Sequence, residues 1–325
     1  MFRGKGLRVL RERLVTVSDH PKVDLFVAEV GDVAAEPLLV IHGGPDWDQS
    51  YLYEPLVRLQ DRRRVVFVDL RGCGRSTRGL PRDAYTPEAA TRDLVALVAA
   101  LTGDPLDVLG FSYGGLLAQR LTLTAPERVR RLVVASSSVI PVPADAFDGW
   151  DARNARLASQ DSFDAPDEWD DDATRLDATS SARANIWRLE LLPDYLDRLE
   201  RIRFSSDWSA SWLGGSLPSA RLDDAPARLA QLGKPILLLH GRQDMTFPAS
   251  LVAPTVELIP TARAAVIEEA GHMAHVDQPE AWLAALRGFL DGGARAGNDP
   301  GSNVQPGARR EPRAASVPRT KRRES

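Results

Sequence analysis

The chain has 325 residues, 43% of them hydrophobic and 26% charged, with a formal net charge of −4 at pH 7. A chain of this length can form one large α/β domain or two smaller ones, and its composition excludes collagen-like and wholly disordered classes. The negative charge argues against a nucleic-acid partner. The lack of about 18 consecutive apolar residues argues against a membrane span.

Cysteine usage and the N-terminal segment both favour a cytoplasmic location. The single cysteine, Cys73, excludes an intramolecular disulfide and a cysteine-based zinc site, and it is typical of a reducing compartment. Residues 1–17 are basic but contain no continuous apolar stretch, so no secretory signal is predicted. We interpret Cys73 as a small buried filler; the alternative is a reactive thiol, because the residue lies between two arginines whose positive charge lowers a thiol pKa.

Short apolar runs alternate with helical patterns along most of the chain. Runs rich in Val, Ile and Leu, rather than alternating with polar residues, are typical of parallel strands that are covered on both faces. The predicted strands are 14–19, 23–31, 37–44, 64–72, 106–112, 131–138, 235–244 and 262–272. The predicted helices between and after them are 86–102, 113–126 and 279–293. This alternation predicts an α/β fold with a mostly parallel, doubly wound sheet of eight strands.

Residues 141–233 interrupt this alternation. They contain no convincing parallel strand, five of the seven tryptophans, and 18 acidic against 10 basic residues. We expect a helical lid that covers the carboxyl ends of the strands, where open α/β sheets bind ligands. The predicted organisation is a core in two parts, 1–140 and 234–291, with this lid between them.

The last segment, 292–325, has a different composition. It carries 8 basic and 3 acidic residues, is rich in Gly, Pro and Ser, and contains only two large aliphatic side chains, both Val. Such a segment cannot bury enough apolar surface to offset its ordering entropy, so a disordered basic tail is predicted. The tail is either an unselected extension or a contact for an anionic partner.

The segment GFSYGG at 110–115 contains the one G-x-S-x-G match in the chain, with Ser112 at its centre. A predicted strand precedes it and a predicted helix follows it, which is the context that a nucleophilic serine on a sharp turn requires. The glycines leave room for the strained backbone of such a turn. Ser112 is therefore the candidate nucleophile, the alternative being a packing serine in a tight turn.

A serine nucleophile needs a base and an orienting carboxylate. His272 follows the last predicted strand, in EEAGHMAHVDQPE, and is the candidate base, with His275 as the alternative. Asp244 follows the strand PILLLHGRQ and is the candidate carboxylate, with Asp277 and Glu269 as alternatives. The chain order serine, aspartate, histidine is the one expected for this type of hydrolase.

An acyl-transfer site also needs backbone donors for the tetrahedral oxyanion. The N–H of Tyr113 follows the nucleophile directly, and Gly44 lies in the glycine loop after the strand 37–42. These two amides are the predicted oxyanion hole. Trp47, shortly after that loop, either lines the pocket or packs in the core. The sequence contains no phosphate-binding loop, dinucleotide fingerprint or metal-ligand cluster, so neither a cofactor nor a metal is expected.

The motifs LLVIHGGPDWD, VVFVDLRGCGRS, GFSYGG, GRQD and AGHMAHVDQPE together resemble the α/β-hydrolase superfamily, and HGGP with GFSYGG resembles its proline iminopeptidase-like branch. The resemblance implies Ser112, Asp244 and His272 as a triad. Those peptidases bind a substrate amine with lid glutamates, which makes Glu190 and the nearby Trp187 candidate substrate contacts. Asp46 stands where they carry the last glycine of HGGPG.

We therefore expect a serine hydrolase that acts through an acyl-enzyme on a small to medium ester, amide or lactone, including the activity of a proline iminopeptidase. One alternative on the same fold is a biosynthetic enzyme that transfers an acyl group, cyclises, eliminates or cleaves a C–C bond. A further alternative is a binding protein that retains the pocket without catalysis. The expected partner is a small molecule, and no pattern in the sequence addresses the oligomeric state.

Overall fold

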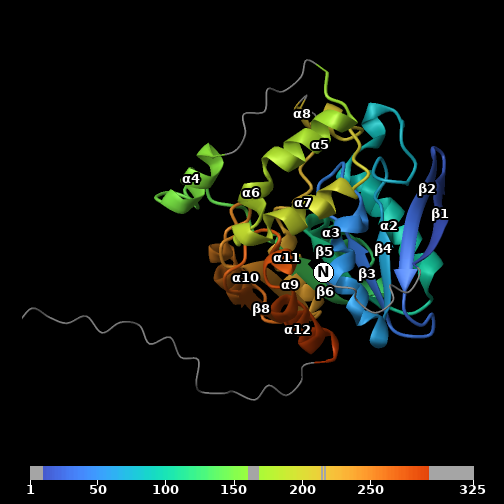
Figure 1. Ribbon diagram of the computed structural model, residues 1–325. Helices are drawn as coiled ribbons and strands as arrows, with labels where there is room; N and C mark the ends of the chain where they lie inside the picture. The colour runs from blue at the N-terminus through green and yellow to red at the C-terminus, as the bar shows by residue number, and fades with distance from the viewer. Residues whose placement is uncertain (1–9, 160–167, 214, 216, 293–325) are drawn as a thin grey trace, which may run out of the picture. The chain divides into compact units, whose positions relative to one another are not determined.

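The computed structural model describes residues 10–159, 168–213, 215 and 217–292. One sheet has the strand order β1-β2-β4-β3-β5-β6-β7-β8. Figure 1 shows β1 and β2 at the right of the molecule and β8 toward the left. Its strands are β1 (Arg11–Asp19), β2 (Lys22–Val30), β3 (Pro37–Ile41), β4 (Arg64–Val68), β5 (Leu106–Phe111), β6 (Val129–Ala135), β7 (Ile236–Gly241) and β8 (Ala262–Ile267). The pairs β1–β2 and β2–β4 are antiparallel and all other pairs are parallel. The predicted mostly parallel sheet of eight strands is confirmed.

Both faces of the central strands are buried, which explains their nearly continuous apolar sequences. Successive residues of β5 illustrate this, because Val108 packs into one hydrophobic cluster and Leu109 into the other. Side chains alternate between the two faces of a strand, so every position needs an apolar residue when both faces are covered. The sheet therefore separates two cores.

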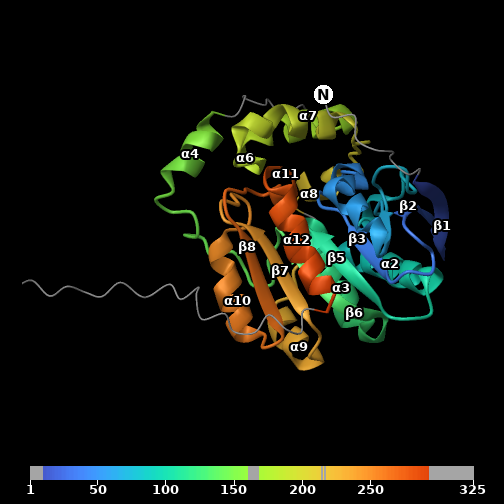
Figure 2. The same cartoon turned by 60° about the horizontal axis from the view of Figure 1, so that its bottom comes forward.

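Helices cover the sheet on both sides. The first core includes residues of α2 (Pro87–Leu101), α3 (Tyr113–Thr124), α9 (Ala225–Leu232) and α10 (Val252–Leu258). The second includes residues of α1 (Tyr53–Leu56), α11 (Ala274–Asp277) and α12 (Pro279–Leu290), the last of which runs along the sheet in Figure 2. The predicted helices 86–102, 113–126 and 279–293 correspond to α2, α3 and α12. Thr86 caps α2 by accepting a hydrogen bond from the N–H of Ala89.

The described residues between β6 and β7 form helices and no strand. These are α4 (Asp151–Ala158), α5 (Asp171–Ser180), α6 (Ala182–Asn185), α7 (Leu192–Glu200), α8 (Ser209–Leu213) and α9. Figure 2 shows α6 and α7 above α11, at one end of the sheet. The last helix, α9, packs against α3 and α10 and so lies with the core layers. The division into core and lid stays a prediction.

Hydrogen bonds and ion pairs hold the segment before α9 to the strand-bearing part of the chain. The carboxylate of Asp277, in α11, accepts hydrogen bonds from the N–H groups of Trp187 and Arg188 at 2.9 Å. Arg78, in the loop after β4, forms ion pairs with Asp171 at 2.7 Å and Asp207 at 3.2 Å. These contacts place α5 to α8 over the carboxyl ends of the strands.

The predicted basic tail, 292–325, lies outside the described residues except for Gly292. Residues up to Gly292 form one compact unit. None of the helices within the described ranges combines the length and the apolar character that crossing a membrane requires.

Candidate active site

A cavity of about 180 Å³ lies at the carboxyl ends of the parallel strands, and we call it the carboxyl-end cavity. The loops after β3, β5, β7 and β8 supply one wall, and Trp169 with residues of α5, α6 and α8 supplies the other. Its lining residues are Gly43, Gly44, Pro45, Trp47, Tyr51, Phe111, Ser112, Trp169, Thr174, Asp177, Asn185, Ser209, Trp212, Thr246, His272 and Met273. Residues that are far apart in the sequence thus meet where α/β sheets bind their ligands.

Ser112 occupies the strained turn between β5 and α3. Its backbone has φ 53° and ψ −121°, a conformation that residues other than glycine rarely adopt. A Cβ atom at Gly110 would overlap the carbonyl of Gly114, and a Cβ atom at Gly114 would overlap the carbonyl of His42. The two glycines therefore let the turn pass close to α3 and β3, and the turn presents Ser112 to the cavity.

His272 and Asp244 are hydrogen-bonded to each other beside the same cavity. His272 Nδ1 lies 3.0 Å from Asp244 Oδ2 and 3.2 Å from Oδ1. Asp244 Oδ1 also accepts hydrogen bonds from the N–H groups of Thr246 at 2.8 Å and Phe247 at 2.9 Å. Both side chains are buried, Asp244 completely. The bond at Nδ1 leaves His272 Nε2 as the ring nitrogen free to exchange a proton.

The environment keeps Asp244 ionised. Burial raises the pKa of its carboxyl, but the charge and hydrogen bond of His272, with smaller contributions from His240 and Phe247, bring the pKa below its usual value. An ionised carboxylate favours the Nδ1–H tautomer of the neutral imidazole and stabilises the imidazolium. The described interactions include no hydrogen bond between Ser112 and His272; such bonds often tighten only when substrate binds.

The two predicted oxyanion donors lie on either side of Ser112. Tyr113 is the first residue of α3, so its N–H has no partner within the helix. Gly44 lines the cavity with φ +112°, a value that favours glycine. Among the described residues, neither amide donates a hydrogen bond to another protein group. The N–H of the preceding Gly43, by contrast, donates to the Tyr51 hydroxyl at 2.8 Å.

The alternatives to the predicted triad residues have other contacts. His275 is 1% exposed, and its ring packs against the rings of Tyr51 and Phe111. The carboxylate of Asp277 accepts from the backbone of Gly271 at 2.7 Å, and Glu269 accepts from Trp187 Nε1 at 3.1 Å. None of the three lines the cavity. Asp277 instead anchors the loop that carries His272.

The three predicted substrate contacts lie in two different places. Trp47 lines the carboxyl-end cavity and packs edge-on against Tyr51 at a centroid distance of 5.2 Å. Trp187 lies outside the cavity lining, bonded to Glu269, and Glu190 is exposed and paired with Arg188 at 2.9 Å. The geometry therefore offers no support for Trp187 and Glu190 as substrate contacts.

The wall formed by α5 to α8 brings residues to the cavity that no sequence motif singles out. Asp177, on α5, is an exposed residue whose carboxylate has no ion pair or hydrogen bond within the described part of the chain. Desolvation by nearby atoms raises the pKa of this carboxyl. Trp169 and Trp212 line the same cavity, and Trp212 is 62% exposed. The tryptophan count of the lid was the only sequence signal for this wall.

Cys73 is completely buried, and burial raises the pKa of its thiol well above the usual value. This environment is that of a buried filler rather than of a reactive thiolate. Within the described ranges, no group of three or more His, Cys, Asp or Glu side chains is arranged to hold a metal ion.

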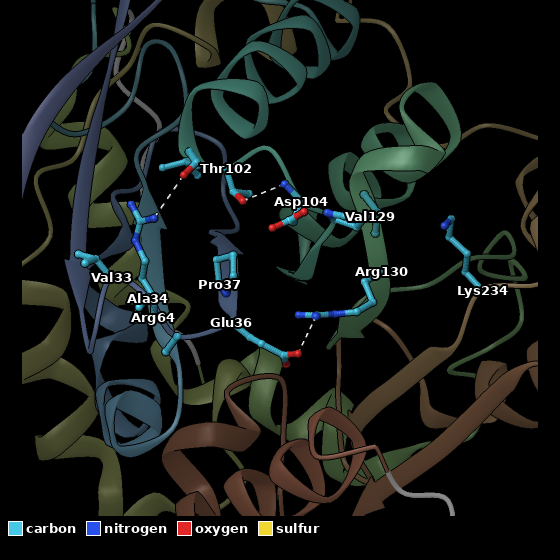
Figure 3. Close-up of a pocket in the computed structure, with 13 residues that line it drawn as sticks. Val33, Ala34, Glu36, Pro37, Arg64, Thr102, Asp104, Val129, Arg130 and Lys234 are labelled. Carbon is cyan, nitrogen blue, oxygen red and sulfur yellow. Dashed lines mark hydrogen bonds and ion pairs between the residues drawn. The ribbon is translucent and has the colours of Figure 1, made fainter.

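A larger cavity, of about 660 Å³, lies at the opposite, amino ends of the parallel strands, and we call it the amino-end cavity. Figure 3 shows that Arg64, Arg130 and Lys234 line it, with Glu36 reaching toward Arg130. The Glu36–Arg130 ion pair measures 2.8 Å, and Arg64 donates to the carbonyl of Leu101 at 3.3 Å. Its arginines are therefore already engaged, and no serine, cysteine or histidine is among the residues that line it.

The chain is similar to known proteins over most of its length. Residues 36–279 match the family described as alpha/beta hydrolase fold. The chain is 30% identical to the proline iminopeptidase of Levilactobacillus brevis, over 80% of this chain and 91% of that protein. It is 28% identical to the 2-hydroxymuconate semialdehyde hydrolase of a Pseudomonas species, over 79% and 87% of the two chains.

Among solved structures, a proline iminopeptidase-related protein of Thermus thermophilus superposes with a TM-score of 0.62. The alignment covers 87% of this chain and 98% of that one, at 24% identity. At this identity the similarity concerns the fold alone.

Proposed function

The chain belongs to the α/β-hydrolase fold family, in its proline iminopeptidase-like branch, and from this premise we propose that it is a serine hydrolase with Ser112 as nucleophile. Its substrate is a small to medium ester, amide or lactone. The observation that carries the proposal is the convergence of a strained serine and a His272–Asp244 pair on one cavity. A packing role for Ser112 would require neither the strain nor the pair.

In the proposed reaction, Ser112 Oγ attacks the substrate carbonyl carbon while His272 Nε2 accepts the hydroxyl proton. Asp244 holds the ring through Nδ1 and stabilises the resulting imidazolium. The amides of Gly44 and Tyr113 donate to the tetrahedral oxyanion. His272 then gives the proton to the leaving group, which departs and leaves an acyl-enzyme. A water molecule, deprotonated by His272, hydrolyses this ester and restores Ser112.

The test is the variant Ser112→Ala, assayed with p-nitrophenyl esters and with a fluorophosphonate probe. We expect the variant to lose probe labelling and to lower kcat by about 10³-fold or more, because the covalent intermediate can no longer form. The matched control is Ser250→Ala, which changes an exposed serine after β7. Unchanged labelling of Ser112→Ala would overturn the proposal.

A second, narrower function is favoured by Asp177. A carboxylate that has no partner among the described residues, in the lining of a cavity that Trp47, Trp169 and Trp212 also line, suits a substrate with a free amine, because carboxylates and aromatic faces both attract cations. This arrangement supports an aminopeptidase activity of the proline iminopeptidase type.

Aminoacyl p-nitroanilides, including that of proline, test this activity beside neutral p-nitrophenyl esters. We expect Asp177→Asn to raise KM about fivefold for the anilides and to leave KM for the esters unchanged, since an exposed ion pair contributes roughly 1 kcal/mol. Cleavage of esters alone by the unaltered protein would remove the aminopeptidase function and retain the hydrolase.

A further inference from the structure

Asp46 connects the loop of the proposed oxyanion hole to the segment that precedes α8. It lies two residues after Gly44, is 2% exposed, and adopts a left-handed backbone conformation with φ 71°. Glycine is the residue that adopts this conformation most readily. An aspartate here carries a backbone strain that glycine would avoid, which directs attention to what its carboxylate binds.

The carboxylate accepts hydrogen bonds from two consecutive residues of the opposite wall. Oδ1 accepts from the N–H of Trp208 at 3.0 Å, and Oδ2 accepts from the N–H of Ser209 at 2.8 Å and from its hydroxyl. The Ser205 hydroxyl lies 2.9 Å from Oδ1 and also contacts the carbonyl of Gly72, so its one proton serves either acceptor. Burial raises the pKa of the Asp46 carboxyl, and these hydrogen bonds oppose that shift by stabilising the ionised form.

Further hydrogen bonds to backbone carbonyls fix the segment 205–209, and its last residue lies in the cavity lining. The carbonyl of Asp46 accepts from the N–H of Ser205 at 2.9 Å, and Trp208 Nε1 donates to the carbonyl of Arg71 at 2.7 Å. Ser209 lines the carboxyl-end cavity together with Gly44. A shift of the segment 205–209 would therefore pull on the chain two residues from the amide that is proposed to face the oxyanion.

We propose that Asp46 is a positioning residue, whose carboxylate fixes the Gly44 amide of the oxyanion hole to the wall of the cavity formed by Trp208 and Ser209. The inference rests on the proposed serine hydrolase function. It assigns a role to the position where this chain departs from the HGGPG pattern, since the side chain does what a glycine cannot.

The variant Asp46→Gly separates the backbone role from the carboxylate role. Glycine accepts φ 71° without strain, so a merely structural turn would keep its activity and stability. If the carboxylate positions Gly44, we expect kcat for a p-nitrophenyl ester to fall about tenfold with KM changed less than threefold, because small displacements of catalytic groups affect the transition state strongly. Inhibition by an alkyl boronic acid, whose adduct with Ser112 mimics the oxyanion, should weaken by the same factor.

The matched control is Ser206→Ala, which removes a hydroxyl of the same segment that donates to Asp171 at 3.0 Å and not to Asp46. We expect its kcat to stay within twofold. If Asp46→Gly keeps its kcat, or if both variants lose kcat equally, the inference is overturned. A loss confined to KM also overturns it, since that would show an effect on binding alone.

The variant Ser209→Ala keeps the test decisive if Asp46→Gly does not fold. It removes only the hydroxyl bond to Oδ2, and we expect about a threefold lower kcat at an unchanged melting temperature. No change in kcat would then contradict the proposal. An active Ser112→Ala variant would overturn the hydrolase function itself, so the two failures are distinguishable.

Discussion

The parallel strands have a cavity at each of their two ends, and the two cavities differ in whether their polar groups already have protein partners. Next to the amino-end cavity, the buried Asp107 accepts hydrogen bonds from Arg130, which lines that cavity, and from Arg63 and Arg131, which do not, at distances of 2.7 to 3.3 Å. At the carboxyl-end cavity, the hydroxyl of Ser112 and the N–H of Gly44 have no protein partner among the described residues. The arginines at the larger cavity are thus engaged by protein groups, whereas the smaller cavity keeps polar groups without a protein partner.

The largest expected effect on stability comes from breaking the arginine cluster at the amino end. Asp107→Asn keeps the shape but leaves the guanidinium of Arg63, which is 6% exposed, without its buried partner. We expect a loss of about 3 kcal/mol in the free energy of unfolding, measured in urea. Below the melting transition, kcat for an ester should stay within twofold.

Glu36→Gln is the control for this variant, because Glu36 pairs with two of the same arginines but is 54% exposed. An exposed pair contributes less than about 1 kcal/mol, so its loss should be small. A strong fall in kcat for Asp107→Asn, at unchanged stability, would show that the amino-end region takes part in the reaction. The two cavities would then not differ in function as described.

We expect the free energy of unfolding to fall in acid because of His42, which is buried at the carboxyl end of β3. Burial lowers its pKa from 6.5 to about 4, and its Nε2 accepts a hydrogen bond from the N–H of Leu70, which a protonated ring could not do. Because the unfolded state takes up this proton first, stability should be complete above pH 6.5 and fall as the pH drops toward 4. The shift corresponds to about 3 kcal/mol.

Urea unfolding at several pH values between 7 and 4 measures this loss. His42→Gln should have a lower stability at pH 7 but a smaller dependence on pH. An equal pH dependence in the variant and the unaltered protein would assign the effect to other groups, such as His240 and His275, whose pKa values are also lowered, first of all by burial.

A smaller effect of opposite sign is expected at Ser112. Glycine adopts φ 53° without strain, so Ser112→Gly should raise the free energy of unfolding by about 1 kcal/mol while abolishing probe labelling. Chemical denaturation measures the first effect. A destabilised variant would show that the serine side chain stabilises the turn and that the conformation is not strained.

The smallest effect is expected at Lys234, which lines the amino-end cavity and pairs with no group in the described ranges. Lys234→Met should change the free energy of unfolding by less than about 0.5 kcal/mol and leave kcat/KM unchanged. A clear loss of activity would assign the amino-end cavity a part in substrate turnover.

The sheet could be predicted because both of its faces are buried. Strands such as β5 are continuous apolar runs, and the predicted range 106–112 differs from the observed one by a single residue. The predicted range 131–138 was less accurate, since β6 already ends at Ala135, before Ser136 with its φ of 44°. The sequence therefore predicted that Ser112 and Asp244 lie just beyond the carboxyl ends of strands, and they follow β5, which ends at Phe111, and β7, which ends at Gly241.

The wall from α5 to α8 could not be predicted in the same way. Asp177 and Trp212 reach the cavity from short helices that have no repeating pattern, and their positions depend on tertiary contacts. Asp46 gave no signal of its partners, because the residues that it binds lie about 160 positions later in the sequence. The choice of Trp187 and Glu190 as substrate contacts failed to gain support for the same reason.

The connection between β6 and β7 has a consequence for how such a fold can change. Parallel neighbours need a crossover, and α9 already provides one by packing between α3 and α10. The preceding segment, which includes α4 to α8, is therefore an insertion in a single connection, and doubling the length of a flexible loop costs only about 0.6 kcal/mol. This segment can therefore be replaced during evolution without a change in the sheet. On the proposed function, its replacement would change which molecules reach Ser112.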